Sequence, residues 1–200
     1  MNIVVANTVG RLADGRHVLS YPSRWSWTGA YKPNCFYAQF LGYAAALLKR
    51  ELPDARVIMV DGNYEQLGPI EYAERLAALE PDVLITEQDA VTYDAMTSTM
   101  LMTKARRPAM RAYLCGAAAS AFWERALGAQ GWDVAVKGEY EYAILDDLRA
   151  GRRDYGYVLH GTAADPDALP LPEDGDVSRI NYADGGNPLP GMVQVYATRG

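Results

Sequence analysis

Short apolar runs alternate with longer helical patterns along most of this chain, and this alternation restricts the possible fold more than any other feature. The runs are predicted strands, at 3–6, 57–60, 83–86, 110–114 and 134–136. The helices predicted between them span 36–51, 69–79, 93–106, 120–129 and 139–149. Strands that alternate with helices are typical of parallel sheets joined by crossover helices. The strands lack a strict apolar–polar alternation, which indicates that both faces of the sheet are covered.

We therefore predict an α/β fold with a doubly wound, Rossmann-like or flavodoxin-like sheet. It has five mainly parallel strands and helices on both faces. In the predicted helix at 36–51, Phe36, Phe40, Ala44 and Leu47 recur every three or four residues and form one apolar stripe against the sheet. In such a sheet, ligands are expected at the carboxyl ends of the strands.

Two segments do not follow the repeat. The stretch 8–34 joins the first strand to the first helix, and it is much longer than the usual connection of about two to six residues. It contains Trp25 and Trp27, and a long aromatic loop suggests a binding loop or a cover over something large. The stretch 160–191 is rich in proline, glycine and aspartate and is predicted to be an extended connector.

These segments divide the chain into three predicted parts. They are an α/β domain at 1–158, a linker rich in proline, glycine and aspartate at 159–191, and a final apolar run at 192–200 with the pattern of a strand. Half of the 200 residues are apolar, which is enough for one well-buried domain.

Charge and composition exclude several classes of protein. The formal net charge is −6 and no cluster of Lys and Arg is longer than a pair, which argues against nucleic-acid binding. The N-terminus lacks the basic region and apolar core of a signal peptide, and no apolar run approaches the roughly eighteen residues of a membrane span. We therefore expect a soluble, cytoplasmic protein. Cys35 and Cys115 are far apart and fit neither a disulfide framework nor a CxxC metal site.

The chain contains few residues of the types that enzymes use for catalysis. The only histidines are His17 and His160, and neither belongs to an HExxH motif. A GxSxG motif and a P-loop lysine motif are absent, and the first strand is followed by NTVGRLADG, which lacks the GxGxxG spacing. NAD or ATP binding of the usual kind is therefore not expected, and we assign no catalytic residue.

The residues typical of a binding site follow three neighbouring predicted strands. The candidates are Thr86 at the end of the third strand, Gly116, Ala117 and Ser120 after the fourth, and Gly138 and Glu139 after the fifth. Small residues after a strand allow a ligand to approach the backbone, and a new helix offers free amides. Two simpler interpretations stay open. The first is that Glu139 does no more than satisfy the amides at the start of the helix. The second is that the small residues after Gly116 permit close packing of the helix on the sheet, instead of leaving a gap for a ligand.

Four stretches, taken in order, resemble the N-terminal cobalamin-binding domain of cobalamin-dependent radical S-adenosylmethionine enzymes. They are LGYAAALLKRELPDARVIMVDG at 41–62, PDVLITEQD at 81–89, MRAYLCGAAASAFWERAL at 110–127 and VKGEYEYAILDDL at 136–148. The final run VQVYATRG resembles the strand that in these enzymes leads into a CxxxCxxC motif, and the sequence ends at Gly200, just before the first cysteine of that motif would be expected.

The resemblance implies that cobalamin binds at the carboxyl edge of the sheet, with contacts from Thr86, Gly116, Ala117, Ser120, Gly138 and Glu139. It implies no metal ligand in this chain, and the aromatic stretch 21–33 becomes a candidate wall against the corrin ring. S-adenosylmethionine and a [4Fe-4S] cluster are expected only in a following C-terminal radical SAM domain, supplied in cis or in trans, which would begin at 192–200. The implied chemistry is methyl transfer, as in a methyltransferase, or related radical chemistry, and this chain alone would not be catalytic.

The chain departs from the family pattern at some positions. Ala117 and Tyr140 stand where the family usually has glycine, and the DxHxxG motif of other cobalamin proteins is absent. Two other functions are therefore considered. One is a cofactor-free, Rossmann-like regulatory or partner-binding module. The other is a stand-alone enzyme, such as a nucleotide-sugar transferase, that uses Asp61 and Glu139 as polar contacts.

Overall fold

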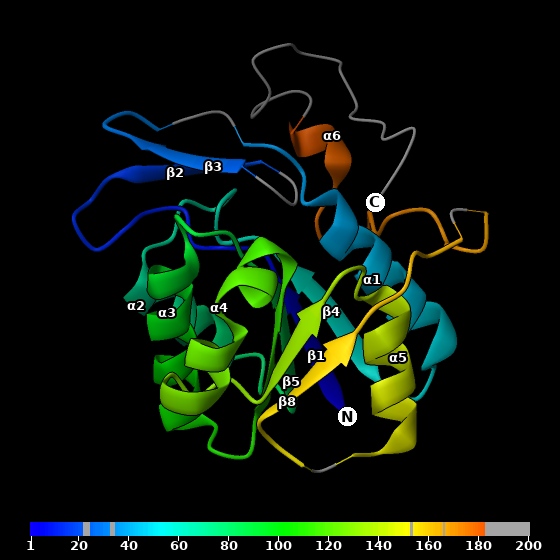
Figure 1. Ribbon diagram of the computed structural model, residues 1–200. Coiled ribbons are helices and arrows are strands. Elements are labelled where there is room, and N and C mark those ends of the chain that lie inside the picture. Colours follow the sequence, from blue (N-terminus) through cyan, green and yellow to red (C-terminus); the bar gives the residue numbers. More distant parts are fainter. Residues whose placement is uncertain (22–24, 33–34, 153, 166, 183–200) are drawn as a thin grey trace.

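A six-stranded parallel sheet forms the centre of the computed structural model, which describes residues 1–182 except 22–24, 33–34, 153 and 166 (Figure 1). The strand order is β4-β1-β5-β6-β7-β8. The strands are β1 (Asn2–Ala6), β4 (Arg56–Val60), β5 (Val83–Glu87), β6 (Arg111–Cys115), β7 (Val134–Lys137) and β8 (Tyr157–His160). The helices are α1 (Gln39–Glu51), α2 (Pro69–Ala77), α3 (Tyr93–Arg106), α4 (Gly116–Ala129), α5 (Glu141–Ala150) and the short α6 (Arg179–Asn181).

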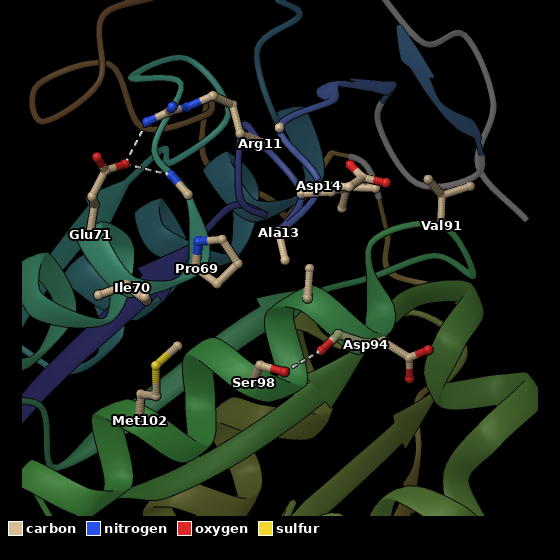
Figure 2. A pocket seen from close by; sticks show the side chains of 14 residues that line it. Arg11, Ala13, Asp14, Pro69, Ile70, Glu71, Val91, Asp94, Ser98 and Met102 are labelled. Carbon is tan, nitrogen blue, oxygen red and sulfur yellow. Dashed lines mark hydrogen bonds and ion pairs between the residues drawn. The ribbon is translucent and has the colours of Figure 1, made fainter. Parts of the chain in front are cut away.

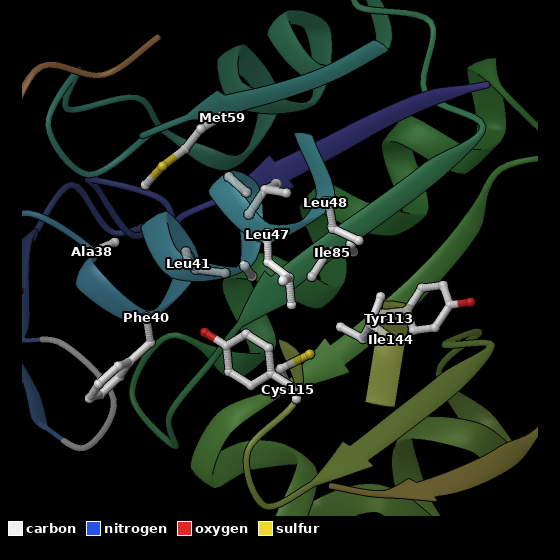
Figure 3. Close-up of a cluster of buried hydrophobic side chains, with 14 of the residues drawn as sticks. Ala38, Phe40, Leu41, Leu47, Leu48, Met59, Ile85, Tyr113, Cys115 and Ile144 are labelled. Carbon is white, nitrogen blue, oxygen red and sulfur yellow. The ribbon is translucent and has the colours of Figure 1, made fainter. Parts of the chain in front are cut away.

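Helices cover both faces of the sheet, as Figure 1 shows. On one face, α1 and α5 enclose an apolar cluster that includes Leu47, Ile85 and Ile144 (Figure 3). On the other face, α2, α3 and α4 enclose a second cluster that includes Met96 and Trp132. The predicted α/β fold with a mainly parallel sheet is therefore confirmed. The apolar runs of the five predicted strands correspond to β1, β4, β5, β6 and β7.

The sheet has one strand more than the sequence predicted. Strand β8 pairs in parallel with β7, with Val134 opposite Tyr157 and Lys137 opposite His160. The predicted domain boundary at residue 158 falls inside this strand. Its four side chains are only partly buried or exposed, so the strand lacks the continuous apolar run that marks the others.

The connection from β7 through α5 to β8 differs in hand from its neighbours. The connections from β5 to β6 and from β6 to β7 each lead to the next strand on the same side, and their helices α3 and α4 lie on one face of the sheet. The connection from β7 to β8 also leads to the next strand on that side, but its helix α5 lies on the opposite face. The β7–α5–β8 unit is therefore a left-handed crossover, which is rare because about 98% of such connections are right-handed.

Part of the long loop 8–34 forms an antiparallel hairpin of β2 (His17–Tyr21) and β3 (Trp25–Gly29). The hairpin lies above α2, α3 and α4 in Figure 1. It is held by hydrogen bonds from Val18 N to Gly10 O at 2.8 Å and from Asn63 Nδ2 to Val18 O at 2.7 Å. The predicted loop is therefore folded, and Trp27 is half exposed on it.

The predicted linker also contains residues that pack on the domain. Glu173 N donates to Gly42 O in α1 at 3.0 Å, and Tyr182, which is buried, donates to Asp61 Oδ2 at 2.5 Å. Packing therefore continues well beyond residue 158. The run 192–200, predicted to begin a following domain, lies outside the described residues.

Candidate functional site

The candidate residues lie at one edge of the sheet, because the carboxyl ends of parallel strands meet at the same edge. Thr86 is in β5, Gly116, Ala117 and Ser120 begin α4 after β6, and Gly138 and Glu139 follow β7. Since β5, β6 and β7 are neighbours in the sheet, the three groups are adjacent, as the sequence predicted.

The loops after β5 and β6 are bonded directly to each other. Gln88 N donates to Cys115 O at 3.1 Å, and Ala118 N donates to Gln88 O at 2.8 Å. Thr86 is fully buried beneath this junction, where its Oγ1 accepts a hydrogen bond from Gln88 Nε2 at 2.5 Å. Thr86 therefore supports the shape of the loop.

Gly116 turns the chain directly from β6 into α4. Its φ of +80° belongs to the left-handed region that favours glycine, and a Cβ at this position would lie 2.6 Å from Glu87 Cγ and 3.0 Å from Gln88 O. The helix predicted to begin at residue 120 begins at Gly116. Of the two interpretations left open for the small residues after Gly116, the structure therefore shows close helix packing and no gap. Ala118 and Ala119 are buried against the sheet, whereas Ala117 and Ser120 are exposed.

The turn after β7 is closed by the segment that follows β8. Gly138 has a φ of +87°, and a Cβ there would lie 2.8 Å from Gly161 O. A Cβ at Gly161 would lie only 1.5 Å from Glu139 O, and Gly161 N donates to Lys137 O at 2.8 Å. The two segments therefore cross in direct backbone contact, and only glycine fits at residue 161.

Glu139 binds this same segment through its side chain. Its Oε2 accepts a hydrogen bond of 2.5 Å from Ala164 N. Helix α5 begins later, at Glu141, and its N-cap Tyr140 makes no side-chain capping bond. The carboxylate of Glu139 thus fixes the chain beyond β8, a role that the sequence did not indicate because residue 164 is distant along the chain.

Asp61 is a buried carboxylate at the end of β4. Its Oδ1 accepts hydrogen bonds from Asn7 Nδ2 and Tyr64 N, both at 2.9 Å, and its Oδ2 accepts the bond from Tyr182. Removal from water raises the pKa of this carboxyl, because burial disfavours its charged form. Asp61 joins the ends of β1 and β4 to the C-terminal part of the described chain, and it is not an exposed contact for a substrate.

A groove of about 1020 Å³ lies at the same edge, on the side covered by α2 and α3 (Figure 2). Its walls are the loop after β1, the start of α2 and the first turns of α3, so it is built by the segments that follow β1, β4 and β5. The lining is largely apolar, with Leu12, Pro69, Ile70, Val91 and Met102.

Charged side chains stand around this groove in pairs. Arg11 binds Glu71 at 2.6 Å across one end, and Asp94 at the start of α3 binds Arg125 of α4 at 3.1 Å. The ring centroids of Tyr93 and Phe122 are 5.2 Å apart, so α4 packs against α3 beside the groove. The groove and the exposed start of α4 therefore flank the same helix.

The sequence did not predict this groove, because no short motif marks it. It forms where the loop containing Arg11 and Asp14 folds against two helices that come much later in the chain. The strand order supplies the one general indication. The crossover from β1 moves outward to β4, whereas the later crossovers move the other way across the sheet, from β5 towards β8. Doubly wound sheets bind ligands at the carboxyl ends of the strands where this movement changes direction, which here is between β1 and β5.

Comparison with known proteins gives no further assignment. No protein-family model, curated protein or solved structure matches the chain. Among the described residues, no three His, Cys, Asp or Glu side chains are grouped closely enough to hold a metal ion. The same part of the chain contains no helix that is long and apolar enough to cross a membrane. The resemblance to cobalamin-binding domains therefore stays a prediction based on the sequence.

Proposed function

We propose that this chain is a cobalamin-binding domain of the kind that precedes the catalytic part of radical SAM enzymes. The groove of about 1020 Å³ at the carboxyl edge supports this proposal. None of the six candidate residues lines the groove itself, so they are proposed as contacts for the part of the cofactor that extends beyond it. Small-molecule sites usually measure roughly 300–1,000 Å³, so a groove at the upper end of that range suits a large cofactor better than a small metabolite. The five neighbouring strands β4-β1-β5-β6-β7 also have the flavodoxin-like order 2-1-3-4-5, and β8 is added outside β7.

The residues at this edge can take different parts in binding. Ala117, Ser120 and Gly138 are exposed and small, so they allow a large, flat ligand to approach the ends of β6 and β7. The first turn of α4 has no acidic residue, so its amides keep the weakly positive end of the helix. Thr86 and Glu139 act indirectly, since they hold the loops in place.

In this proposal the chain binds the cofactor, and the reaction takes place in a radical SAM domain that acts together with it. When bound, cobalamin supplies a methyl group or related radical reactivity, which the cofactor itself provides. The residues of this chain bind and orient it, and we assign none of them a catalytic role. S-adenosylmethionine and a [4Fe-4S] cluster belong, in this proposal, to a following C-terminal radical SAM domain in the cytoplasm.

The test is retention of colour. The protein is mixed with hydroxocobalamin and desalted, and the absorbance of the retained corrin is measured. Ala117→Trp is expected to abolish retention, whereas the same substitution at Ala129, exposed at the other end of α4, is expected to preserve it. Gly116 and Gly138 are poor positions for this test, because a larger side chain would strain the backbone there. A colourless wild-type protein would overturn the proposal.

The second candidate is a cofactor-free module that binds another protein. Its support is the exposure of Ile70 and Val91 at the groove, 64% and 40% respectively, because exposed apolar patches often mark sites of protein–protein contact. This candidate predicts no retained corrin in the wild type or in either tryptophan variant. The colour experiment therefore separates the two functions directly.

A further inference from the structure

The segment 173–182, called the strap from here on, begins on α1. Glu173 N donates to Gly42 O at 3.0 Å, the Tyr37 hydroxyl donates to Glu173 O, and Lys49 Nζ lies 3.0 Å from Glu173 Oε1. Gly42 makes room for this arrangement, because a Cβ there would lie 2.2 Å from the Tyr37 hydroxyl oxygen. Helix α1 therefore carries a fitted attachment point for the strap.

The middle of the strap covers the outer edge of the sheet. Asp176 Oδ2 accepts hydrogen bonds from Met59 N and from Lys49 Nζ, both at 2.8 Å. Met59 is in β4, which pairs only with β1 and is therefore an edge strand. The outer amides of an edge strand normally stay open to water or to another strand. Here a side-chain carboxylate takes one of them.

The end of the strap is a tyrosine inserted into the domain. Tyr182 is 4% exposed, and its hydroxyl donates to Asp61 Oδ2. Its ring meets the ring of Tyr37 edge-on with centroids 5.5 Å apart, and the ring of Tyr64 with centroids 4.7 Å apart. Tyr182 therefore fills a pocket with aromatic walls and a buried carboxyl group at its floor.

We propose that the strap is a releasable latch, which docks on α1 and β4 in the closed state and uncovers the Tyr182 pocket and the edge of β4 in the open state. The residues between its two ends, from Asp174 to Asn181, are partly or largely exposed, so few side chains hold it. In the open state, water can reach Lys49, the Met59 amide and Asp61. Release therefore leaves none of these polar groups buried without a partner.

The latch acts on the binding edge through Asp61. The same carboxyl group that accepts the Tyr182 hydroxyl also accepts Asn7 Nδ2, and Asn7 begins the connection from β1 that leads into the wall of the groove. Opening of the strap removes the Tyr182 hydroxyl from Asp61. Water then reaches the Asp61 carboxyl group, which still accepts the hydrogen bond from Asn7. The state of the strap and the shape of the carboxyl edge are thereby coupled. This inference does not depend on which ligand the groove binds.

Hydrogen exchange on the wild-type protein is the first test. The amide of Asp176 donates to Glu173 Oε2 at 3.0 Å in the closed strap. A latch opens locally, so this amide is expected to exchange at least about tenfold faster than the amides in the middle of α1. Exchange of Asp176 and α1 at one common rate would overturn the proposal, because the strap would then open only when the whole domain unfolds.

Binding of the strap in trans is the second test. The double variant Asp176→Asn and Tyr182→Ala weakens the closed state, and a fluorescein-labelled peptide with the sequence of residues 169–182 is the probe. The folded variant is expected to bind this peptide at least about tenfold more tightly than the wild type, whose own strap competes at an effective concentration on the order of millimolar. Leu171→Ala, at an 80% exposed position just before the strap, is the matched control and is expected to behave as the wild type. Equal affinity of the wild type and the folded double variant would overturn the proposal.

Discussion

The Tyr140 hydroxyl donates a hydrogen bond of 2.9 Å to Glu87 Oε2 and so joins the start of α5 to the end of β5. The bond passes over the end of β6, which lies between β5 and β7 in the sheet. Tyr140 stands where the resemblance led us to expect glycine, and it is 1% exposed. The larger side chain therefore packs into the core and ties two loops of the candidate site together.

Replacement of Tyr140 by phenylalanine keeps the ring and removes this hydrogen bond. We expect Tyr140→Phe to lower the free energy of unfolding by about 1–2 kcal/mol, because a hydrogen bond to a charged group contributes more than a neutral one. Urea unfolding followed by circular dichroism measures the change. Tyr142→Phe, two residues further along α5, is the control. Equal stability of the Tyr140 variant and the wild type would contradict the assigned role.

Replacement of Gly161 by alanine tests the crossing of two segments beyond β7 and β8. The added Cβ would lie 1.5 Å from Glu139 O, so the segments must separate. We expect a loss of about 3 kcal/mol or more, since strain of this kind belongs to the severe class of substitutions. Gly128→Ala in α4 has nothing within 4 Å and is expected to stabilise the protein by about 0.5–1 kcal/mol. Thermal unfolding curves of the two variants should therefore shift in opposite directions.

Asp147 connects α5 to the amino ends of the strands. It accepts hydrogen bonds from Tyr113 at 2.6 Å and Tyr157 at 2.8 Å, and Arg111 lies 3.1 Å from its Oδ2. Asp147→Ala leaves a mostly buried arginine without this partner, and we expect it to cost about 3–5 kcal/mol in guanidinium unfolding. The neighbouring Asp146 is exposed, so Asp146→Ala is expected to change stability very little. Similar losses in both variants would disprove the network's importance.

The pH dependence of stability should report on Asp61. Burial raises the pKa of this carboxyl above its ordinary value of 3.8. The folded state therefore favours the protonated form more than the unfolded state does. The stability that Asp61 contributes is complete below the unfolded pKa and is lost as pH rises through the folded pKa. We expect Asp61→Asn to remove this fall from the curve of unfolding free energy against pH. Asp54→Asn, in an exposed turn before β4, should leave the curve unchanged.

The two cysteines should be unreactive in the folded protein. Cys35 is 3% exposed and burial raises its pKa to about 12, while Cys115 is fully buried with its pKa also raised. Thiolate is the reactive form, so both thiols are protected by burial and by protonation. Ellman's reagent should label neither cysteine under native conditions and both in concentrated guanidinium chloride. Rapid labelling of the native protein would show that one of these sites opens.

The sequence indicated the main sheet because strands buried on both faces leave continuous apolar runs. The runs around Val5 and Ile85 are of this kind, and both residues are fully buried. Strand β8 gave no such signal, since Val158 and Leu159 are only partly covered. The two strands of the hairpin also lack a continuous apolar run. Their aromatic and polar residues lie within a long connection, a pattern that is typical of a loop.

The candidate site was predictable only in its local part. The turns at Gly116 and Gly138 were located correctly, because a strand, a glycine and a helical pattern follow one another within a few residues. The contacts of these glycines were not predictable, since Gln88 and Gly161 come from other connections. The groove forms because the loop that contains Arg11 folds against α2 and α3, and no local sequence pattern predicts the path of this loop.

The bond between Asp176 and the amide of Met59 also makes the two edges of the sheet unequal as places where a further strand could pair. A new strand beside β4 would need that amide, and a carboxylate already holds it at 2.8 Å. Strand β8 forms the opposite edge, and its known pairing uses only the side that faces β7. Among the residues that the structure describes, β8 is thus the side on which another chain, or another copy of this one, can continue the sheet while the strap stays in place.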